Sequence, residues 1–141
     1  MSDQLKLEVV TPHRTVLMED VDSVTLPGIE GELGILPEHV PLLTTLDTGI
    51  MSYRSNGKKL AIAVHWGYAQ VEGNSVRVLA ELAETADEID LQRAQEAESK
   101  AKNVLDSTAS STNWEEEQSR QNKYESKLKR AFVRQKVAQF N

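Results

Sequence analysis

The chain has 141 residues, of which 39% are hydrophobic, 27% charged and only 5% aromatic, a composition that favours one small folded domain, with or without an appendage. It contains no cysteine, which excludes a disulfide framework, a thiolate zinc site and a cysteine nucleophile. The formal net charge of −6 argues against nucleic acid as a partner of the whole surface.

Glycine and proline are confined to the first part of the chain. All seven glycines and all four prolines precede Thr85. These residues make turns, so their absence from the remainder permits long helices. The charge divides at the same place, because the acidic excess lies entirely within residues 1–84. We therefore predict two domains, 1–84 and 85–141.

Residues 1–84 are typical of an antiparallel β-sandwich or barrel. Short runs rich in β-branched residues recur between turn signals, and Val76, Val78 and Ala80 follow a period of two. The Asn56-Gly57 pair predicts a hairpin turn, because both residues tolerate positive φ. The predicted strands are Leu5–Val10, Arg14–Met18, Ser23–Leu26, Ile50–Arg54, Leu60–Val64, Tyr68–Glu72 and Ser75–Leu79.

A loop between Pro27 and Pro37 carries glycines three residues apart, a spacing that resembles a phosphate-binding fingerprint. The acidic Glu30 and Glu32 would repel phosphate, however, and no helix pattern follows the loop. Two interpretations stay open from the residues alone. The loop is a tight β connection, or it is a docking loop that presents Glu30 and Glu32 to a partner.

Residues 85–141 are typical of two helices. Thr85 and Glu88 have the spacing of a capping box, which predicts a first helix over Ile89–Leu105. A polar linker over Asp106–Asn113 follows, and a second helix begins near Trp114 with acids in its first turn and bases towards its end. Two helices joined by a short loop form an antiparallel hairpin. The apolar face of the first helix is mostly alanine, so we expect the hairpin to be able to detach while the β domain stays folded.

No catalytic centre can be assembled from the sequence. The histidines His13, His39 and His65 lack metal-ligand spacing, and neither a phosphate-binding P-loop nor a nucleophile elbow is present. We therefore expect no catalytic residue and no metal site, and we do not expect an enzyme.

Charged residues of the two helices instead suggest an anion site. Arg93 and Lys100 are seven residues apart, and Arg130 and Arg134 are four apart, so each pair shares one helix face. Antiparallel folding brings the second pair towards the start of the first helix. The cations could then surround a nucleoside triphosphate, while Glu84 and Asp90 accept hydrogen bonds from an adenine amino group or a ribose. The alternative is ordinary salt bridging on the helix surfaces.

Several blocks of the sequence resemble the epsilon subunit of F-type ATP synthases. The resemblance covers essentially the whole chain and is weakest over residues 103–122. It rests on Leu7–Pro12, Glu19–Gly28, Gly31–Leu43, Ala63–Ala69, Val76–Glu81 and Ile89–Ala94. It implies an N-terminal antiparallel β-sandwich followed by a C-terminal two-helix antiparallel hairpin. It also implies a non-catalytic central-stalk subunit of a rotary, proton-translocating synthase, with no required cofactor.

The resemblance further implies partners and contact residues. The sandwich would bind the gamma subunit, and the loop at Gly28, Glu30, Gly31 and Glu32 would face the c-ring. The complex would place the chain peripherally on a cell inner membrane or thylakoid membrane, on the cytoplasmic or stromal side. A stand-alone ATP-sensing module outside the synthase is the alternative function.

The helical hairpin would be regulatory in such a family. Extended into the catalytic head, it would inhibit ATP hydrolysis by meeting the beta and alpha subunits, with an acidic beta-subunit segment facing Lys123, Lys127, Arg130 and Arg134. In some bacterial members ATP binds the compact hairpin through an I/L-D-x-x-R-A motif and arginines of the second helix. The matching residues are Glu84, Asp90, Arg93, Arg130 and Arg134, while Lys100 stands where those members often carry arginine.

Overall fold

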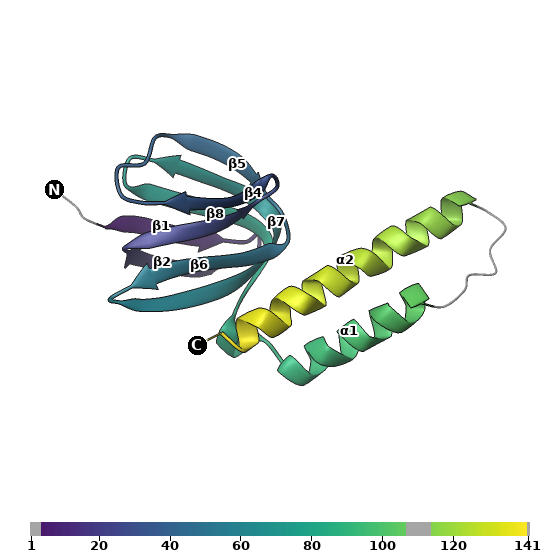
Figure 1. Cartoon of the computed structure of the whole chain (residues 1–141). Helices are drawn as coiled ribbons and strands as arrows, with labels where there is room; N and C mark the ends of the chain where they lie inside the picture. The colour runs from purple at the N-terminus through teal and green to yellow at the C-terminus, as the bar shows by residue number, and fades with distance from the viewer. Residues whose placement is uncertain (1–3, 107–113, 141) are drawn as a thin grey trace.

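A computed structural model describes residues 4–106 and 114–140, so most of the predicted linker, at residues 107–113, lies outside the described chain. The described residues form a β domain followed by two helices (Figure 1). The strands are β1 (Leu5–Val10), β2 (Thr15–Val21), β3 (Ser23–Gly28), β4 (Gly31–Ile35), β5 (Leu42–Leu46), β6 (Gly49–Ser55), β7 (Lys58–Glu72) and β8 (Ser75–Thr85). The helices are the 3₁₀ turn η1 (Ala86–Glu88), α1 (Leu91–Asp106) and α2 (Trp114–Ala138).

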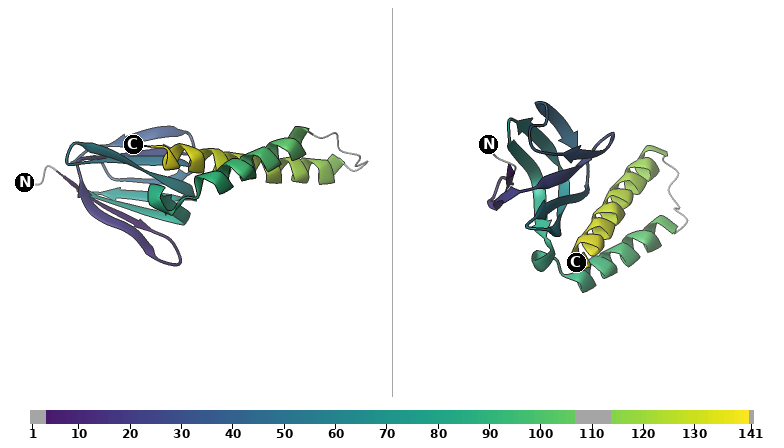
Figure 2. Two further views of the ribbon diagram at one scale, coloured as in Figure 1. Left: turned by 90° about the horizontal axis from the view of Figure 1, so that it is seen from below. Right: turned by 60° about the vertical axis from the view of Figure 1, so that its left-hand side comes forward.

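The strands pair in the order β2-β1-β8-β7-β5-β3-β4, and β6 pairs with β3 and β7. Every pair is antiparallel except β1 with β8, which is parallel. Strand β7 pairs with β6 along its first half and with β5 along its second half, while β8 runs beside both halves. The hydrogen-bonded sheet therefore folds over itself into two layers, which confirms the predicted β-sandwich (Figure 2).

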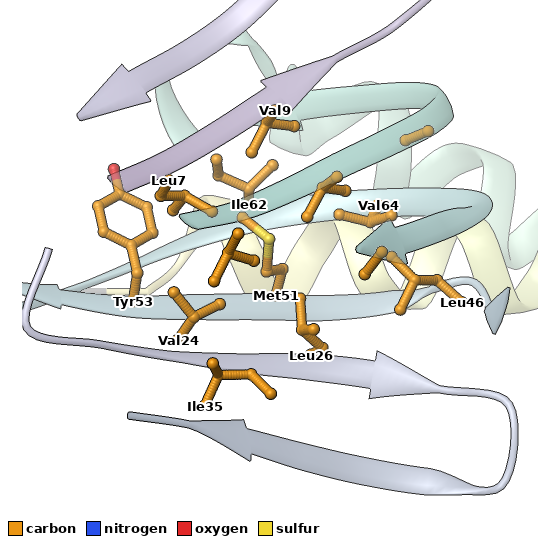
Figure 3. Close-up of a cluster of buried hydrophobic side chains, with 14 of the residues drawn as sticks. Leu7, Val9, Val24, Leu26, Ile35, Leu46, Met51, Tyr53, Ile62 and Val64 are labelled. Atoms are coloured by element: carbon orange, nitrogen blue, oxygen red, sulfur yellow. The ribbon is translucent and has the colours of Figure 1, made fainter. Parts of the chain in front are cut away.

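Aliphatic side chains from both layers fill the space between them (Figure 3). Leu7 and Val9 of β1 face Ile62 and Val64 of β7, and each of these side chains is at most 1% exposed. Full burial of such a side chain contributes about 1.5–3 kcal/mol relative to leaving it in water. Val76, Val78 and Ala80, which follow a period of two in the sequence, are buried in this core.

Strand β7 is one continuous strand where the sequence predicted two. Core-facing side chains fall on even positions before Trp66, such as Ile62 and Val64, and on odd positions after it, such as Ala69 and Val71. Trp66 has a φ of 61° and changes the alternation at that point. We call this change the Trp66 kink.

Glycine is required next to the Trp66 kink. A Cβ atom on Gly67 would lie 2.1 Å from the carbonyl oxygen of Leu79, closer than any backbone atom tolerates. The two strands therefore approach closely there and keep one register on both sides of the kink. As a result, Ala61, Ala63 and His65 on the first half of β7 face outwards, towards the helices.

The Pro27–Pro37 loop is a β-hairpin formed by β3 and β4, and β4 was missed by the sequence prediction together with β5. Its tip runs from Gly28 to Gly31, where Gly31 has a φ of 133°. A Cβ atom on Gly28 would lie 2.6 Å from the carbonyl oxygen of Gly31. The glycines therefore serve the tight β connection, which was one of the two open interpretations.

The capping box is present but does not start the long helix. The backbone N–H and hydroxyl of Thr85 donate to Glu88 Oε1 at 3.1 and 2.9 Å. This motif caps the N-terminus of η1. Helix α1 begins at Leu91 rather than Ile89, because Asp90 caps it. Asp90 Oδ1 accepts from the backbone N–H of Arg93 at 3.1 Å.

The helices form the predicted antiparallel hairpin, and α2 rather than α1 packs against β6 and β7 (Figures 1 and 2). Val133 and Val137 of α2 cover Ala61 and Ala63 of β7. The contact between the two helices is made by small side chains, and its buried residues include Ala94, Ala101 and Ala131. No described helix contains a segment of the length and apolarity needed to cross a bilayer.

Candidate functional site

A cavity of about 560 Å³ lies between α1 and α2 beside the sandwich. All six residues that the sequence suggested for an anion site line it, so the fold brings the whole set together. We call it the anion cavity; its charged lining residues are Glu84, Glu88, Asp90, Arg93, Lys100, Lys127, Arg130 and Arg134. A second hollow, over one side of α1, has only Glu96 and Lys100 as charged residues and lacks this cluster.

Most of the cations that line the anion cavity are not paired with an acid of the described chain. Within residues 4–106 and 114–140, Arg93, Lys100, Lys127 and Arg130 form no ion pair. Lys127 Nζ lies 5.0 Å from the ring centroid of Tyr124, which also lines the cavity. Clustered, unneutralised cations in a hollow favour an anionic ligand, because each would gain a charge-assisted hydrogen bond.

The acids of the cavity are already engaged in the fold. Asp90 caps α1 through one carboxylate oxygen, and Glu88 accepts from Thr85 and from Arg14 Nη2 of the β1–β2 turn. These groups gather where η1 meets α1, so a bound anion would hold its negative groups away from them. An amino or hydroxyl group of a ligand could still donate to the remaining carboxylate oxygens.

Glu84 connects the sandwich to α2. Its Oε1 accepts from His65 Nε2 at 3.0 Å and from Arg134 Nε at 2.7 Å. Burial raises the pKa of Glu84, but the hydrogen bonds from His65 and Arg134 outweigh it and leave the pKa below its ordinary value. Sequence reasoning placed Glu84 and Arg134 in one site but missed His65, since only the Trp66 kink turns that side chain towards the helices. We call His65, Glu84 and Arg134 the Glu84 cluster.

Another ion pair joins α2 to the sandwich at Lys129, nearer the N-terminus of the helix than Arg134. Lys129 Nζ lies 2.5 Å from Asp47 Oδ2 in the β5–β6 turn. The hydrogen bond from Lys129 lowers the pKa of Asp47. Because Glu84 is 21% exposed and Asp47 is 40% exposed, solvent screens the Asp47 pair more strongly.

Acidification should detach α2 from the sandwich. The pKa values of Glu84 and Asp47 are lowered in the docked state, so their contribution to docking is present above their ordinary pKa and is lost as the pH falls through the lowered values. We expect Val137 methyl resonances to lose their docked shifts below about pH 4, while those of Val64 in the core persist. Loss of both sets at the same pH would contradict separate detachment.

The predicted ring-facing residues lie at the tip of the β3–β4 hairpin. Glu30 and Glu32 are exposed, and neither forms an ion pair with a described residue. Gly28 and Gly31 shape the turn between the strands. Ile29 adds an apolar side chain that is 58% exposed, so the tip combines negative charge with a hydrophobic contact.

The predicted inhibitory residues lie on α2. Lys127, Arg130 and Arg134 line the anion cavity, whereas Lys123 lies outside it with its Nζ 5.7 Å from the ring centroid of Tyr124. Three of the four cations therefore face α1 in this arrangement. The two residue sets that the sequence suggested for ATP and for inhibition overlap on this face of α2.

A row of four residues, which we call the apolar row because Tyr68, Leu79 and Val10 dominate it, crosses the outer face of the sandwich and was not predicted from the sequence. Thr45, Tyr68, Leu79 and Val10 are successive cross-strand partners on β5, β7, β8 and β1. Tyr68 is 49% exposed and Leu79 is 46% exposed, and the Trp66 ring lies edge-on to Tyr68 at 6.3 Å. Apolar side chains on the solvent face at alternating positions were the available signal. Exposed apolar side chains on neighbouring strands make this row a candidate interaction surface.

Comparison with known proteins gives one consistent result. The family model described as "ATP synthase, Delta/Epsilon chain, beta-sandwich domain" matches residues 4–86. The ATP synthase epsilon chain of Geotalea uraniireducens is 44% identical over 138 residues, covering 98% of this chain and 96% of the relative. That of Carboxydothermus hydrogenoformans is 53% identical over 105 residues, covering 74% and 78%.

Solved structures show the same fold at lower identity. A chain in the Euglena gracilis mitochondrial ATP synthase, a structure of OSCP, F1 and the c-ring, has a TM-score of 0.76 and 23% identity, covering 92% of this chain and 78% of that chain. A chain in the central stalk and c-ring structure of the Tetrahymena thermophila mitochondrial ATP synthase has a TM-score of 0.60 and 14% identity, covering 95% and 96%. With a β-sandwich matched by the family model and relatives of more than 40% identity along almost its whole length, the chain belongs to the ATP synthase epsilon chain family.

Proposed function

We propose that this chain is a non-catalytic central-stalk subunit of a rotary, proton-translocating ATP synthase. It couples the c-ring to the gamma subunit through its sandwich and regulates ATP hydrolysis through its helices. The observation that carries the coupling role is the exposed apolar row of the sandwich. In the assembled synthase the chain would be peripheral to a cell inner membrane or thylakoid membrane, on the cytoplasmic or stromal side, and it would need no cofactor.

The apolar row supports docking of gamma. The half-exposed side chains of Tyr68 and Leu79 on neighbouring strands, with Val10 beside them, offer an apolar contact surface to a partner. The Arg77–Glu8 ion pair, at 3.4 Å, lies on the next row and offers a polar rim. The acidic tip at Glu30 and Glu32 remains free for a second partner, which we propose to be the polar loops of the c-ring.

Association with gamma tests the coupling role. The full chain, mixed with purified gamma subunit at micromolar concentration, should elute with it as one complex in gel filtration. Failure to associate would contradict the central-stalk function. It would favour the stand-alone ATP-sensing module, whose activity would need only the anion cavity.

The anion cavity supports ATP as a regulatory ligand of the compact hairpin. Cations from both helices line one hollow, so a triphosphate would bridge α1 and α2 and hold the hairpin closed. Acids near η1 suit the amino or hydroxyl groups of a nucleoside rather than its phosphates. Lys100 contributes charge without the bidentate geometry of arginine, so it acts as a point charge.

The overlap of residue sets on α2 supports a competition between two states. In the compact state Lys127, Arg130 and Arg134 face the anion cavity. In an extended state the same cations, together with Lys123, would be free to meet an acidic segment of the beta subunits, with the alpha subunits close by. ATP would therefore oppose inhibition by occupying the cations that inhibition requires.

The variant with Lys123→Ala, Lys127→Ala and Arg130→Ala should relieve inhibition of ATP hydrolysis. It retains Arg134 and hence the Glu84 cluster, so docking of α2 on the sandwich should persist. With up to about 1 kcal/mol for each surface ion pair, the concentration for half-inhibition of epsilon-free F1 should rise roughly tenfold or more. Lys102→Ala removes a cation from α1 outside the cavity and serves as the control. Full inhibition by the triple variant would rule out the electrostatic account.

A further inference from the structure

His65 is a buried titratable residue for which the proposed function has no use. Its side chain is 5% exposed, and it projects from β7 towards α2 because of the Trp66 kink. Nε2 is bonded to Glu84, while Nδ1 has no hydrogen-bond partner among the described residues. A buried imidazole with only one of its two nitrogens hydrogen-bonded needs an explanation.

The chemistry of Glu84 sets the direction of the hydrogen bond with His65. The Glu84 carboxylate only accepts, so Nε2 carries the proton and donates. The same oxygen, Oε1, also accepts from Arg134 Nε. Two donors on one oxygen fix the position of that oxygen more tightly than either would alone.

The position of Glu84 determines how Arg134 meets the cavity. Glu84 holds Arg134 by Nε, and neither Nη group of Arg134 has a partner among the described residues. Arg134 lines the anion cavity, and the free Nη groups are its remaining donors. Without a fixed Glu84 the guanidinium could turn and offer the carboxylate two donors, as arginine–carboxylate pairs often do.

We propose that His65 is a positioning residue for the anion cavity: its hydrogen bond to Glu84 restricts Arg134 to an Nε contact and so leaves the Nη groups for an anionic ligand. This inference rests on the proposed nucleotide role of the cavity. His65 does not line the cavity itself and acts only through Glu84. The other charged groups at this junction are Arg130 of α2 and Glu88 of η1, and neither contacts His65 by a hydrogen bond.

The test compares His65→Leu with His65→Gln in the full chain. Leucine fills the site without a donor, whereas the glutamine side-chain amide can donate to Glu84 in place of Nε2. We expect His65→Leu to bind ATP roughly tenfold more weakly by calorimetry, as for loss of an organising hydrogen bond to a charged group. We expect His65→Gln to stay close to the unsubstituted chain. Thermal melting of each variant checks that the sandwich is folded.

A spectroscopic readout separates this inference from the nucleotide role. The Arg134 side-chain Nε–H resonance, assigned by its absence in Arg134→Lys, reports the bond to Glu84 without any ligand. This resonance should shift in His65→Leu and should keep its original position in His65→Gln. An unshifted resonance in a folded His65→Leu chain would overturn the inference, whether or not ATP binds. If the unsubstituted chain fails to bind ATP, the nucleotide role is lost and this resonance alone decides the positioning of Arg134.

Discussion

Replacing Leu79 by glutamate should weaken association with the gamma subunit by at least about 100-fold. Leu79 is the central side chain of the apolar row, flanked by Tyr68 on β7 and Val10 on β1. A carboxylate there would lose its hydration on complex formation and gain no partner, which costs several kcal/mol. Because Leu79 is 46% exposed, the isolated sandwich should keep its melting temperature to within a few degrees.

Leu82→Glu is the matched control for this experiment. Leu82 is the same residue type on the same strand and is 39% exposed, but it lies beyond the Trp66 kink and pairs with His65. It therefore projects from the other layer of the sandwich and lies outside the apolar row. Gel filtration and calorimetric titration with gamma measure both variants. Unchanged binding of gamma to Leu79→Glu would remove the apolar row from the interface.

Replacing Arg93 by alanine should weaken ATP binding roughly 30-fold or more. Arg93 lines the anion cavity and forms no ion pair with any described residue, so its guanidinium is available to a phosphate. A hydrogen bond to a charged group contributes about 1.5–3 kcal/mol, and its loss accounts for an effect of this size. The cap on α1 survives, because Asp90 bonds the backbone N–H of Arg93 rather than its side chain.

Lys102→Ala controls for the loss of one positive charge from α1. Lys102 is exposed and does not line the cavity, and its Nζ lies 4.0 Å from Glu98 Oε1. Isothermal titration calorimetry measures the affinity of the unsubstituted, Arg93→Ala and Lys102→Ala chains for ATP, with ADP for comparison. Because Arg93 is not one of the α2 cations, the Arg93→Ala chain should still inhibit F1, and relief of that inhibition should need roughly 30-fold more ATP. Wild-type affinity in Arg93→Ala would exclude it from the ligand contacts.

The sequence predicted most of the sandwich because core side chains alternate along its strands. It missed β4, whose sequence Gly31–Ile35 has two glycines and only one fully buried side chain, Ile35. That strand exists because its backbone pairs with β3, which no local pattern reveals. It also ended one strand at Val64 and began the next at Tyr68, although Gly67 between them marks a close approach of β7 and β8 within one continuous strand.

The anion cavity was predictable to the extent that helix periodicity defines it. Spacing places Arg93 with Lys100 and Arg130 with Arg134, and an antiparallel hairpin brings the two faces together. The part that could not be predicted depends on how α2 docks on the sandwich. The Asp47–Lys129 pair joins residues 82 positions apart, and His65 meets Glu84 only because Trp66 changes the alternation of β7.

The Trp66 kink has a mechanical consequence. It divides one two-stranded ribbon, β7 with β8, into a half whose outer face carries Tyr68 and Leu79 and a half whose outer face carries His65 and Glu84. The pairing has the same register on both sides of the kink, so we expect the two halves to move together as one ribbon. A force applied to the apolar row would be shared among the successive hydrogen bonds between β7 and β8. Because α2 docks on the half that carries His65 and Glu84, we expect the other half, with the apolar row, to keep its shape whether the hairpin is folded or released.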